Sequence, residues 1–312
     1  MHELVLLPVG RGKRSGDAMA LRFRRPDTGA MAHVVIDAGY PEEGPAVVDF
    51  VRRRHRTERI DLAILTHPDP DHIGGMAEVL TRLEVAELWI HRLDQRAGEH
   101  VPDAATVRSL VALAERRGTR VIEPWAGHSA FGGALRVLGP DEEYYDRLAA
   151  EQASGEEPYK YSEPVRTARE VADQIAHWLP WELPFDDHEG TTARNNSSVV
   201  LAIDLPGFRA LLPADAGVPA LSRALDAMAA AGLDPKPWDL IVIPHHGSKR
   251  NATDVLLDRL VGRIGEAPPG LAFVSAASGS PWHPAFQVVR AYERRGRTVR
   301  VTAGHRLRHA SG

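Results

Sequence analysis

The 312-residue sequence contains no cysteine. Disulfide cross-links, thiol redox chemistry and thiolate-bound zinc are therefore excluded, and the folded state must depend on packing or on metals held by other side chains. Long apolar runs are also missing, because no segment approaches the roughly 20 residues that a membrane span requires. The apolar run at residues 4–9 has no basic segment before it, unlike a signal peptide. We therefore expect a cytoplasmic protein that makes no membrane contact.

A basic excess is missing as well. Lys and Arg number 38 against 42 Asp and Glu, which gives a net charge of −4 and argues against a protein that coats nucleic acid through a large positive surface. The net charge does not exclude a local basic groove. The 15 histidines that accompany the absence of cysteine favour catalytic metal chemistry, because imidazole binds divalent ions and transfers protons near neutral pH.

Short runs rich in Val, Ile and Leu, each closed by Gly, Pro or Asp, predict strands. They lie at residues 4–9, 18–23, 33–36, 62–65, 87–90, 135–138, 199–203, 208–212, 240–243, 271–275 and 298–301. Helical patterns occupy residues 46–54, 76–83, 104–117, 219–230, 254–261 and 284–295. Because the first three strands lack intervening helices and the later strands alternate with helices, we expect one α/β domain over residues 1–312, with two sheets covered by outer helices.

The stretch at residues 141–194 interrupts this alternation. It is polar, punctuated by proline, and too long for a routine connection. It also contains more tyrosine and tryptophan than a solvated linker requires. Two interpretations stay open: a partly helical surface insertion, or a flap that contacts the substrate.

The most informative segment is LAILTHPDPDHIGGM at residues 62–76. His67, Asp69 and Asp71 follow a predicted strand at alternate positions, so in an extended loop their side chains point the same way. His72 comes next, where the chain turns into a helix. Four potential ligands within six residues indicate a metal site, and the alternative is an acidic turn that caps the following helix.

Other segments repeat the pattern of an apolar strand beside a polar residue. Asp215 follows one strand in ALLPADAG, His245 and His246 follow another in LIVIPHHGSKRNA, and Asn196 precedes a third in ARNNSSVVLAI. His283 lies at the entry to the last predicted helix. Because α/β proteins build sites at strand ends, we expect these segments to converge.

The ordered motifs HxDxDHxGG, Asn-Asn-x-Ser, Asp after a strand, HHGS and His-Pro resemble those of the metallo-β-lactamase fold hydrolases. Among these, the sequence is most similar to the hydrolase domain of the ComEC/Rec2 DNA-uptake proteins. VGRGKRSGDAMALRF resembles the opening strand of that branch, and HVVIDAG resembles its Leu-Ile-Asp-Thr-Gly segment. The resemblance implies a four-layer αββα sandwich of two mixed sheets flanked by helices.

The resemblance also implies a centre for two divalent metal ions, Zn²⁺ or Mn²⁺. The implied ligands are His67, Asp69, Asp71, His72, Asp215 and His245. Asp71, His72 and His245 would hold one ion, and Asp215 would bridge to the second, which His67 also ligates. His245 is preferred because it comes directly after the strand and Pro244, and His246 is the alternative.

Two positions depart from the wider superfamily. Asp69 and Asn196 stand where that superfamily places histidines, which leaves the ion held by His67 with fewer nitrogen donors. Oxygen-rich ligation favours harder ions, so this half of the centre is expected to bind weakly or to prefer Mn²⁺ over Zn²⁺.

The expected chemistry is hydrolysis by a metal-bridged hydroxide, most consistent with a phosphodiesterase or nuclease. The residues expected to act in catalysis are Asp71, Asn196 and His283, with His283 protonating the leaving oxygen; those expected to bind phosphate are Ser198, Ser248 and Lys249. Plainer roles are available too: Ser248 as a helix cap, Asn196 as a turn residue and His283 as a helix-start residue.

Two other functions stay open. One is hydrolysis of a small ester, thioester, lactone or lactam, with the aromatic insertion as a lid. The other is a metal-poor binding module without catalysis. The expected partner of the leading hypothesis is nucleic acid or another phosphodiester, and the sequence leaves the oligomeric state open.

Overall fold

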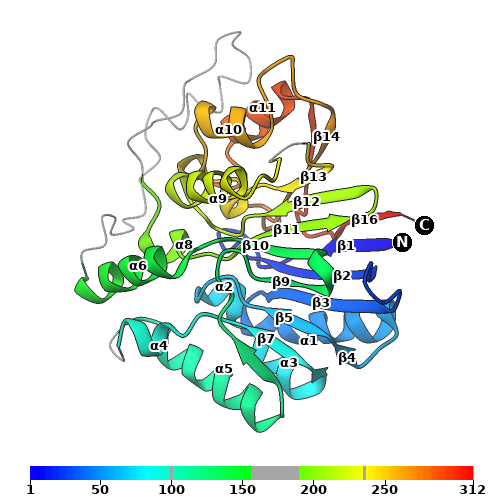
Figure 1. The fold of residues 1–312 in the computed structure, drawn as a ribbon, viewed down its shortest axis with the longest axis vertical. Helices are drawn as coiled ribbons and strands as arrows, with labels where there is room; N and C mark the ends of the chain where they lie inside the picture. The colour runs from blue at the N-terminus through cyan, green and yellow to red at the C-terminus, as the bar shows by residue number, and fades with distance from the viewer. Residues whose placement is uncertain (99–100, 156–189, 235–236, 312) are drawn as a thin grey trace.

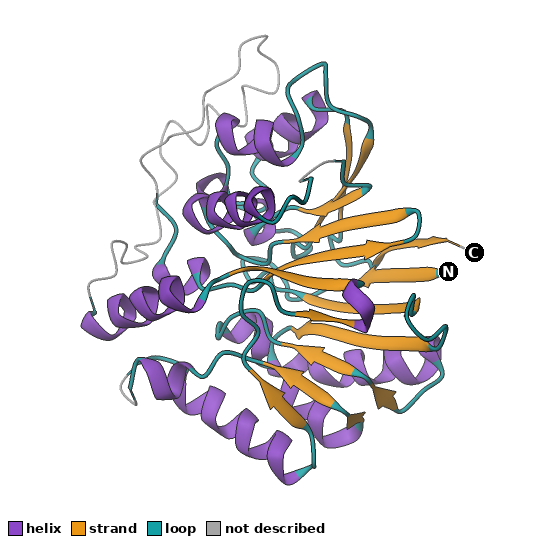
Figure 2. Ribbon diagram, viewed as in Figure 1, coloured by secondary structure: helices purple, strands orange, loops and turns teal. Residues whose placement is uncertain are grey.

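The computed structural model describes residues 1–98, 101–155, 190–234 and 237–311. In this part of the chain two seven-stranded sheets pack face to face, and helices cover the outer face of each sheet (Figures 1 and 2). The four-layer αββα arrangement expected from the sequence is therefore confirmed.

The first sheet combines an antiparallel half with a parallel half. In spatial order its strands are β16 (Leu307–Ser311), β1 (His2–Leu6), β2 (Ala18–Arg24), β3 (Met31–Ala38), β5 (Leu62–Ile64), β7 (Glu87–Trp89) and β8 (Arg120–Ile122). Neighbours from β16 to β3 are antiparallel, and those from β3 to β8 are parallel. The parallel half needs crossover helices, which are α1 (Gly44–Phe50), α3 (Met76–Arg82) and α5 (Ala104–Arg116).

The second sheet repeats this plan. Its strands in spatial order are β15 (Arg297–Val301), β14 (Gly270–Val274), β13 (Leu240–Val242), β12 (Phe208–Leu212), β11 (Val200–Leu205), β10 (Leu135–Gly139) and β9 (Ser129–Ala130). Neighbours from β9 to β12 are antiparallel, and those from β12 to β15 are parallel. Its covering helices are α9 (Val218–Ala230), α10 (Asp254–Leu260) and α11 (Phe286–Arg294).

The remaining elements lie in the connections. They are η1 (Pro41–Glu43), η2 (Val51–His55), β4 (Arg59–Ile60), α2 (Pro70–Ile73), β6 (Glu84–Val85), α4 (Leu93–Arg96), η3 (Phe131–Gly133), α6 (Glu142–Ser154), α8 (Ala193–Asn196), η5 (His245–Gly247) and η6 (Lys249–Asn251). β4 and β6 pair with each other as a small separate sheet.

Burial on both faces explains why central strands such as β5 and β13 are apolar throughout. On β3, Val34 and Ile36 join the core between the two sheets, whereas Val35 packs under the helices of the first sheet. Trp89 and Phe273 are fully buried in the core between the sheets, one from each sheet. The core between the sheets thus receives side chains from both sheets.

The sequence pattern did not predict β8, β9 or β16. Of the insertion expected at residues 141–194, the structure describes α6 at one end and α8 at the other, and residues 156–189 lie outside the described residues. Tyr145 of α6 is buried, so this part of the insertion packs on the domain. None of the helices in the described ranges combines the length and the apolar character needed to cross a bilayer.

Candidate metal centre

The motif at residues 62–76 divides into two pairs of side chains. The Nε2 atom of His67 lies 3.6 Å from Oδ2 of Asp69 in the loop after β5. Helix α2 begins at Pro70, so the extended stretch ends earlier than the alternating pattern indicates, and Asp71 and His72 project from the helix. Nε2 of His72 lies 3.7 Å from Oδ2 of Asp71.

Asp215, in the turn after β12, lies between these two pairs and is almost fully buried. Its Oδ1 atom lies 3.4 Å from Nε2 of His72 and 3.9 Å from Nε2 of His246. Its Oδ2 atom lies 3.6 Å from Nε2 of His245 and 3.8 Å from Nε2 of His67. One carboxylate therefore presents one oxygen to each of two sets of imidazoles.

The hydrogen bonds of His72 and His246 fix which ring nitrogen carries the proton in the neutral imidazole. Nδ1 of His72 lies 2.8 Å from Oδ2 of Asp37, and Nδ1 of His246 lies 2.9 Å from the carbonyl oxygen of Ser275. Both partners are acceptors, so each Nδ1 is the donor. Each Nε2 then has a lone pair that faces the centre, the arrangement found in metal-binding histidines.

His67 is oriented through Thr66. The hydroxyl of Thr66 donates to Oδ2 of Asp37 at 2.7 Å, so its oxygen is left to accept from Nδ1 of His67 at 3.1 Å. The Nε2 atoms of His67 and His72 and the Oδ1 atom of Asp215 are buried without a hydrogen-bond partner. Leaving such atoms unpaired costs free energy, and divalent ions bound here would satisfy them. The donor set therefore fits a metal.

His245 and His246 lie on opposite sides of this centre. Nε2 of His246 is 3.3 Å from Oδ2 of Asp71, and His246 is buried. Asn251 donates its amide to the carbonyl oxygens of Asp215 and Ala216, so its Oδ1 accepts from Nδ1 of His245 at 2.9 Å. Nε2 of His245 faces Oδ2 of Asp215, with its side chain 26% exposed at the rim.

The structure also places Asn195, rather than Asn196, against His245. The amide nitrogen of Asn195 lies 3.4 Å from Nε2 of His245. Asn196 donates its amide to the carbonyl oxygen of Thr191 and accepts from the backbone N–H of Gly217. Because both ends of the Asn196 amide are used in this way, its position fits the plainer role of a turn residue.

The remaining predicted residues lie at different distances from the centre. Ser248 caps η6, where its hydroxyl accepts from the backbone N–H of Arg250, and Lys249 begins that same turn beside the histidine pair. Ser198 is buried and lines a separate cavity with Tyr144 and Arg223. Ser248 and Lys249 therefore lie in the turn directly after the histidine pair, whereas Ser198 lines a cavity formed by other side chains.

His283 lies next to the histidine pair. Its ring centroid is 5.9 Å from that of His245 and 6.1 Å from that of His246. Burial, together with the neighbouring His245 and His246, lowers the pKa of His283 to about 3. The metal-free protein therefore holds His283 as a neutral imidazole at the edge of the centre.

Two carboxylates at the centre were not predicted as site residues. Asp37 is fully buried at the end of β3, and Asp17 is buried with its Oδ1 atom 3.7 Å from Nδ1 of His246. Groupings with metal-binding spacing include Asp17 with Asp215 and His246. A sequence signal was available, because an acidic residue inside or beside an apolar strand must find a partner when it is buried.

The carboxylates create a negative field at the histidines. Burial alone would lower the pKa of His72, but Asp215, Asp37 and Asp71 raise it well above the ordinary value. Burial also opposes the charge on His246, yet Asp215, Asp71 and Asp17 raise its pKa to about 9. Protons therefore occupy Nε2 positions that a metal ion would take, and both respond to the same field.

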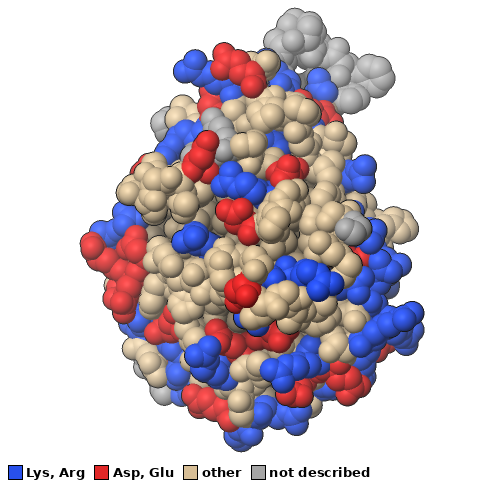
Figure 3. Space-filling view, turned by 45° about the vertical axis from the view of Figure 1, so that its right-hand side comes forward, with Lys and Arg blue, Asp and Glu red and all other residues tan. Residues whose placement is uncertain are grey.

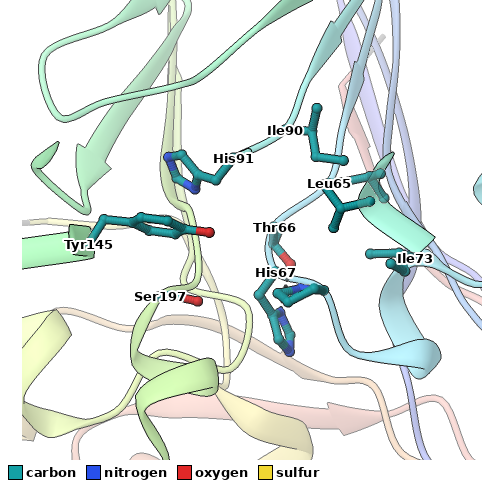
Figure 4. Close-up of a pocket in the computed structure, with 10 residues that line it drawn as sticks. Leu65, Thr66, His67, Ile73, Ile90, His91, Tyr145 and Ser197 are labelled. Atoms are coloured by element: carbon teal, nitrogen blue, oxygen red, sulfur yellow. Dashed lines mark hydrogen bonds between the residues drawn. The ribbon is translucent and has the colours of Figure 1, made fainter. Parts of the chain in front are cut away.

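A small cavity lies beside His67. Figure 4 shows His67 and Thr66 facing His91, Tyr145 and Ser197 across it. Its volume of about 10 Å³ suffices for one water molecule at most. This cavity is too small to hold a substrate.

Comparison with known proteins places the fold. A family model described as the metallo-beta-lactamase superfamily matches residues 25–270, and a search of curated proteins found no significant match. Similar solved structures include a variant of the CmlA β-hydroxylase, with 17% sequence identity and a TM-score of 0.47. The match covers 98% of this chain and 53% of the CmlA chain. A diphosphatase of the PhnP family has 11% sequence identity and a TM-score of 0.45, and the match covers 100% of this chain and 98% of the diphosphatase. A metallo-β-lactamase from Cronobacter sakazakii has 13% sequence identity and a TM-score of 0.38, and the match covers 77% of this chain and 79% of the lactamase.

Replacing Asp37 tests whether the orientation of His67 and His72 depends on it. In Asp37→Asn, an amide N–H faces the Nδ1 donor of His72 or the Thr66 hydroxyl, so the affinity for Zn²⁺ or Mn²⁺ is expected to fall by roughly 10-fold to 100-fold. Isothermal titration calorimetry of the metal-depleted protein measures this. Asp49→Asn, a surface carboxylate paired with Arg53, is the matched control and should bind like the wild type. Unchanged affinity in Asp37→Asn would refute this role.

Metal binding is expected to release protons near neutral pH. Because the raised pKa values keep His72 and His246 protonated at pH 7 in the metal-free protein, an ion must displace at least one proton. The apparent affinity should then rise with pH, about tenfold per pH unit for each proton displaced, until His246 deprotonates near pH 9. Calorimetry in buffers of different ionisation enthalpy counts the protons, and His246→Gln should release one fewer. A proton count of zero at pH 7 would contradict the electrostatics described above.

Proposed function

The chain belongs to the metallo-β-lactamase superfamily of hydrolases, and on that premise we propose that it cleaves phosphodiesters with two divalent ions held around Asp215. The observation that supports this proposal most is that the two carboxylate oxygens of Asp215 face two separate sets of imidazoles. A two-ion centre suits a phosphodiester, because both the attacking and the leaving oxygen develop charge that needs to be stabilised.

One set of ligands is nearly complete. Asp71, His72, His246 and Oδ1 of Asp215 supply two nitrogens and two oxygens, separated by 3.3–3.9 Å for the pairs given above. Ligands about 2.0–2.2 Å from a tetrahedral ion lie about 3.3–3.6 Å apart, so these separations are close to what Zn²⁺ or Mn²⁺ needs. In this proposal His246 takes the position that the sequence alone assigned to His245.

The other set is poorer in nitrogen. His67, Asp69 and Oδ2 of Asp215 would hold the second ion, and the oxygen-rich composition favours a hard ion such as Mn²⁺. When bound, the two ions supply Lewis acidity toward the phosphoryl group and activate water for attack. Nε2 of His245 stays at the rim, where the Asn251 hydrogen bond keeps its lone pair directed inward.

The chain contributes groups for an anionic substrate beside this centre. Lys249 supplies a positive charge, and the cap at Ser248 holds the turn that carries it. His283 lies within reach of the histidine pair. An anionic phosphodiester bound next to His283 would favour the protonated imidazole, which could then donate a proton to the leaving oxygen.

Nucleic acid, as in the ComEC/Rec2 proteins that the sequence resembles, is one phosphodiester that the proposal includes. On the face shown in Figure 3, basic and acidic side chains are interspersed. Recognition of a polyanion on this face would therefore depend on local cations rather than on a broad positive surface.

A substrate panel tests the proposed reaction. The metal-loaded protein is expected to hydrolyse bis(p-nitrophenyl) phosphate and at least one of single-stranded DNA and RNA, and metal removal should abolish turnover. Assays with Zn²⁺ and Mn²⁺ are run beside a lactone, a thioester and a β-lactam. Turnover of one of these three without turnover of any phosphodiester would refute the proposal, as would the absence of all turnover in protein that binds metal.

The role of His283 predicts a dependence on the leaving group. His283→Gln should lower the kcat for a dinucleotide by about 100-fold, because an alkoxide must be protonated as it leaves. The same change should alter the kcat for bis(p-nitrophenyl) phosphate by no more than about threefold, since nitrophenolate leaves without a proton. His305→Gln, at an exposed histidine, is the control. Equal losses for both substrates would show that His283 does not donate this proton.

A further inference from the structure

Arg194 of α8 lies beside Asp69, in the set of ligands that contains His67. Its Nη1 atom is 3.0 Å from Oδ1 of Asp69 and 3.2 Å from Oδ2 of Asp103, and its side chain is 20% exposed. The other oxygen of Asp69 faces Nε2 of His67 at 3.6 Å. Asp69 therefore shares its charge between a guanidinium and the position where the second ion would lie.

The Asp71 side of the centre is arranged differently. There Oδ2 of Asp71 faces only imidazole nitrogens among the contacts described, those of His72 and His246. These imidazoles become neutral when they ligate an ion, so that side keeps the full charge of its carboxylates for the metal. The guanidinium of Arg194 keeps its positive charge throughout the working pH range, as arginine side chains do in proteins.

The donors on the His67 side are also engaged elsewhere. The amide of Asn196, one of the predicted site residues, bonds to the backbone of Thr191 and Gly217. Nε2 of His245 is within hydrogen-bonding distance of the Asn195 amide. One imidazole nitrogen, from His67, is left as the uncontested nitrogen donor on this side among the described residues.

We propose that Arg194 makes the two halves of the centre unequal. The Asp71 half binds a divalent ion tightly, and the His67 half binds its ion weakly and exchanges it readily, because the fixed charge of Arg194 both neutralises Asp69 and repels the ion. Full occupancy then depends on the concentration of free metal. This inference rests on the ligand sets of the proposed function, but it concerns binding and not the reaction catalysed.

Two substitutions are expected to shift the affinity of the His67 half for its ion in opposite directions. Arg194→Gln removes the positive charge and should strengthen binding at the His67 half by about tenfold or more. Asp103→Asn removes a second carboxylate that contacts Arg194, so more of the guanidinium charge acts on Asp69, and the second ion should bind more weakly than in the wild type. Asp103 has a φ of 67°, a left-handed conformation that asparagine tolerates well. Asp103→Asn therefore keeps the test available if Arg194→Gln folds poorly.

Mn²⁺ titration of the metal-depleted full chain, followed by electron paramagnetic resonance of the free ion, measures both affinities directly. The wild type should bind one ion tightly and a second at least about tenfold more weakly. Arg194→Lys, which keeps the charge, should stay close to the wild type. Asp69→Asn should lose the second ion and keep the first.

Two ions of equal affinity in the wild type would overturn the inference, and so would a second affinity that neither Arg194→Gln nor Asp103→Asn changes. These outcomes are independent of turnover. A protein that shows unequal binding but cleaves no phosphodiester would refute the proposed function and leave this inference standing. A protein that cleaves phosphodiesters with two equal ions would do the reverse.

Discussion

The centre depends on the hydrogen bonds of one carboxylate, Asp37. This residue is fully buried at the end of β3, in a left-handed conformation with φ of 54°. It accepts from the backbone N–H of Thr66, from the Thr66 hydroxyl and from Nδ1 of His72. A buried carboxylate is tolerated only when its oxygens are paired in this way, and pairing them fixes the two rings that begin and end the HxDxDH motif.

The sandwich supplies the geometry that this arrangement needs. The first sheet delivers Asp37 from β3 and His67 from the loop after β5, whereas the second sheet delivers Asp215 after β12 and His246 after β13. Parallel neighbours end at the same edge of a sheet, so consecutive loops meet there. Because the sheets pack face to face through a continuous apolar core, the two edges are held together rigidly, and five or more polar side chains can be buried at one point.

Most strands and the outline of this centre could be predicted from the sequence because their signals are local, whereas the four-layer arrangement was implied by the resemblance of the ordered motifs. Apolar strands followed by ligand-type residues identify His67, His72 and Asp215 without any knowledge of contacts. The choice between His245 and His246 could not be made in this way. Both residues follow β13, and both adopt a positive φ, so the backbone turns sharply at the point where the two rings diverge. The choice between Asn195 and Asn196 could not be made either. The two residues are neighbours in one short helix, yet the amide of Asn195 faces His245 and that of Asn196 bonds to the backbone of Thr191.

Proton and metal compete for the same negative field, and this links the stability of the metal-free chain to pH. The folded-state pKa of His246 is raised to about 9, above its ordinary value, so the proton on His246 stabilises the metal-free fold fully below pH 6.5. That contribution is lost as the pH rises through 9. A bound ion replaces the proton and removes this dependence. The cluster of Asp17, Asp37, Asp71 and Asp215 therefore requires positive charge in either state, and the imidazoles supply it whenever metal is scarce.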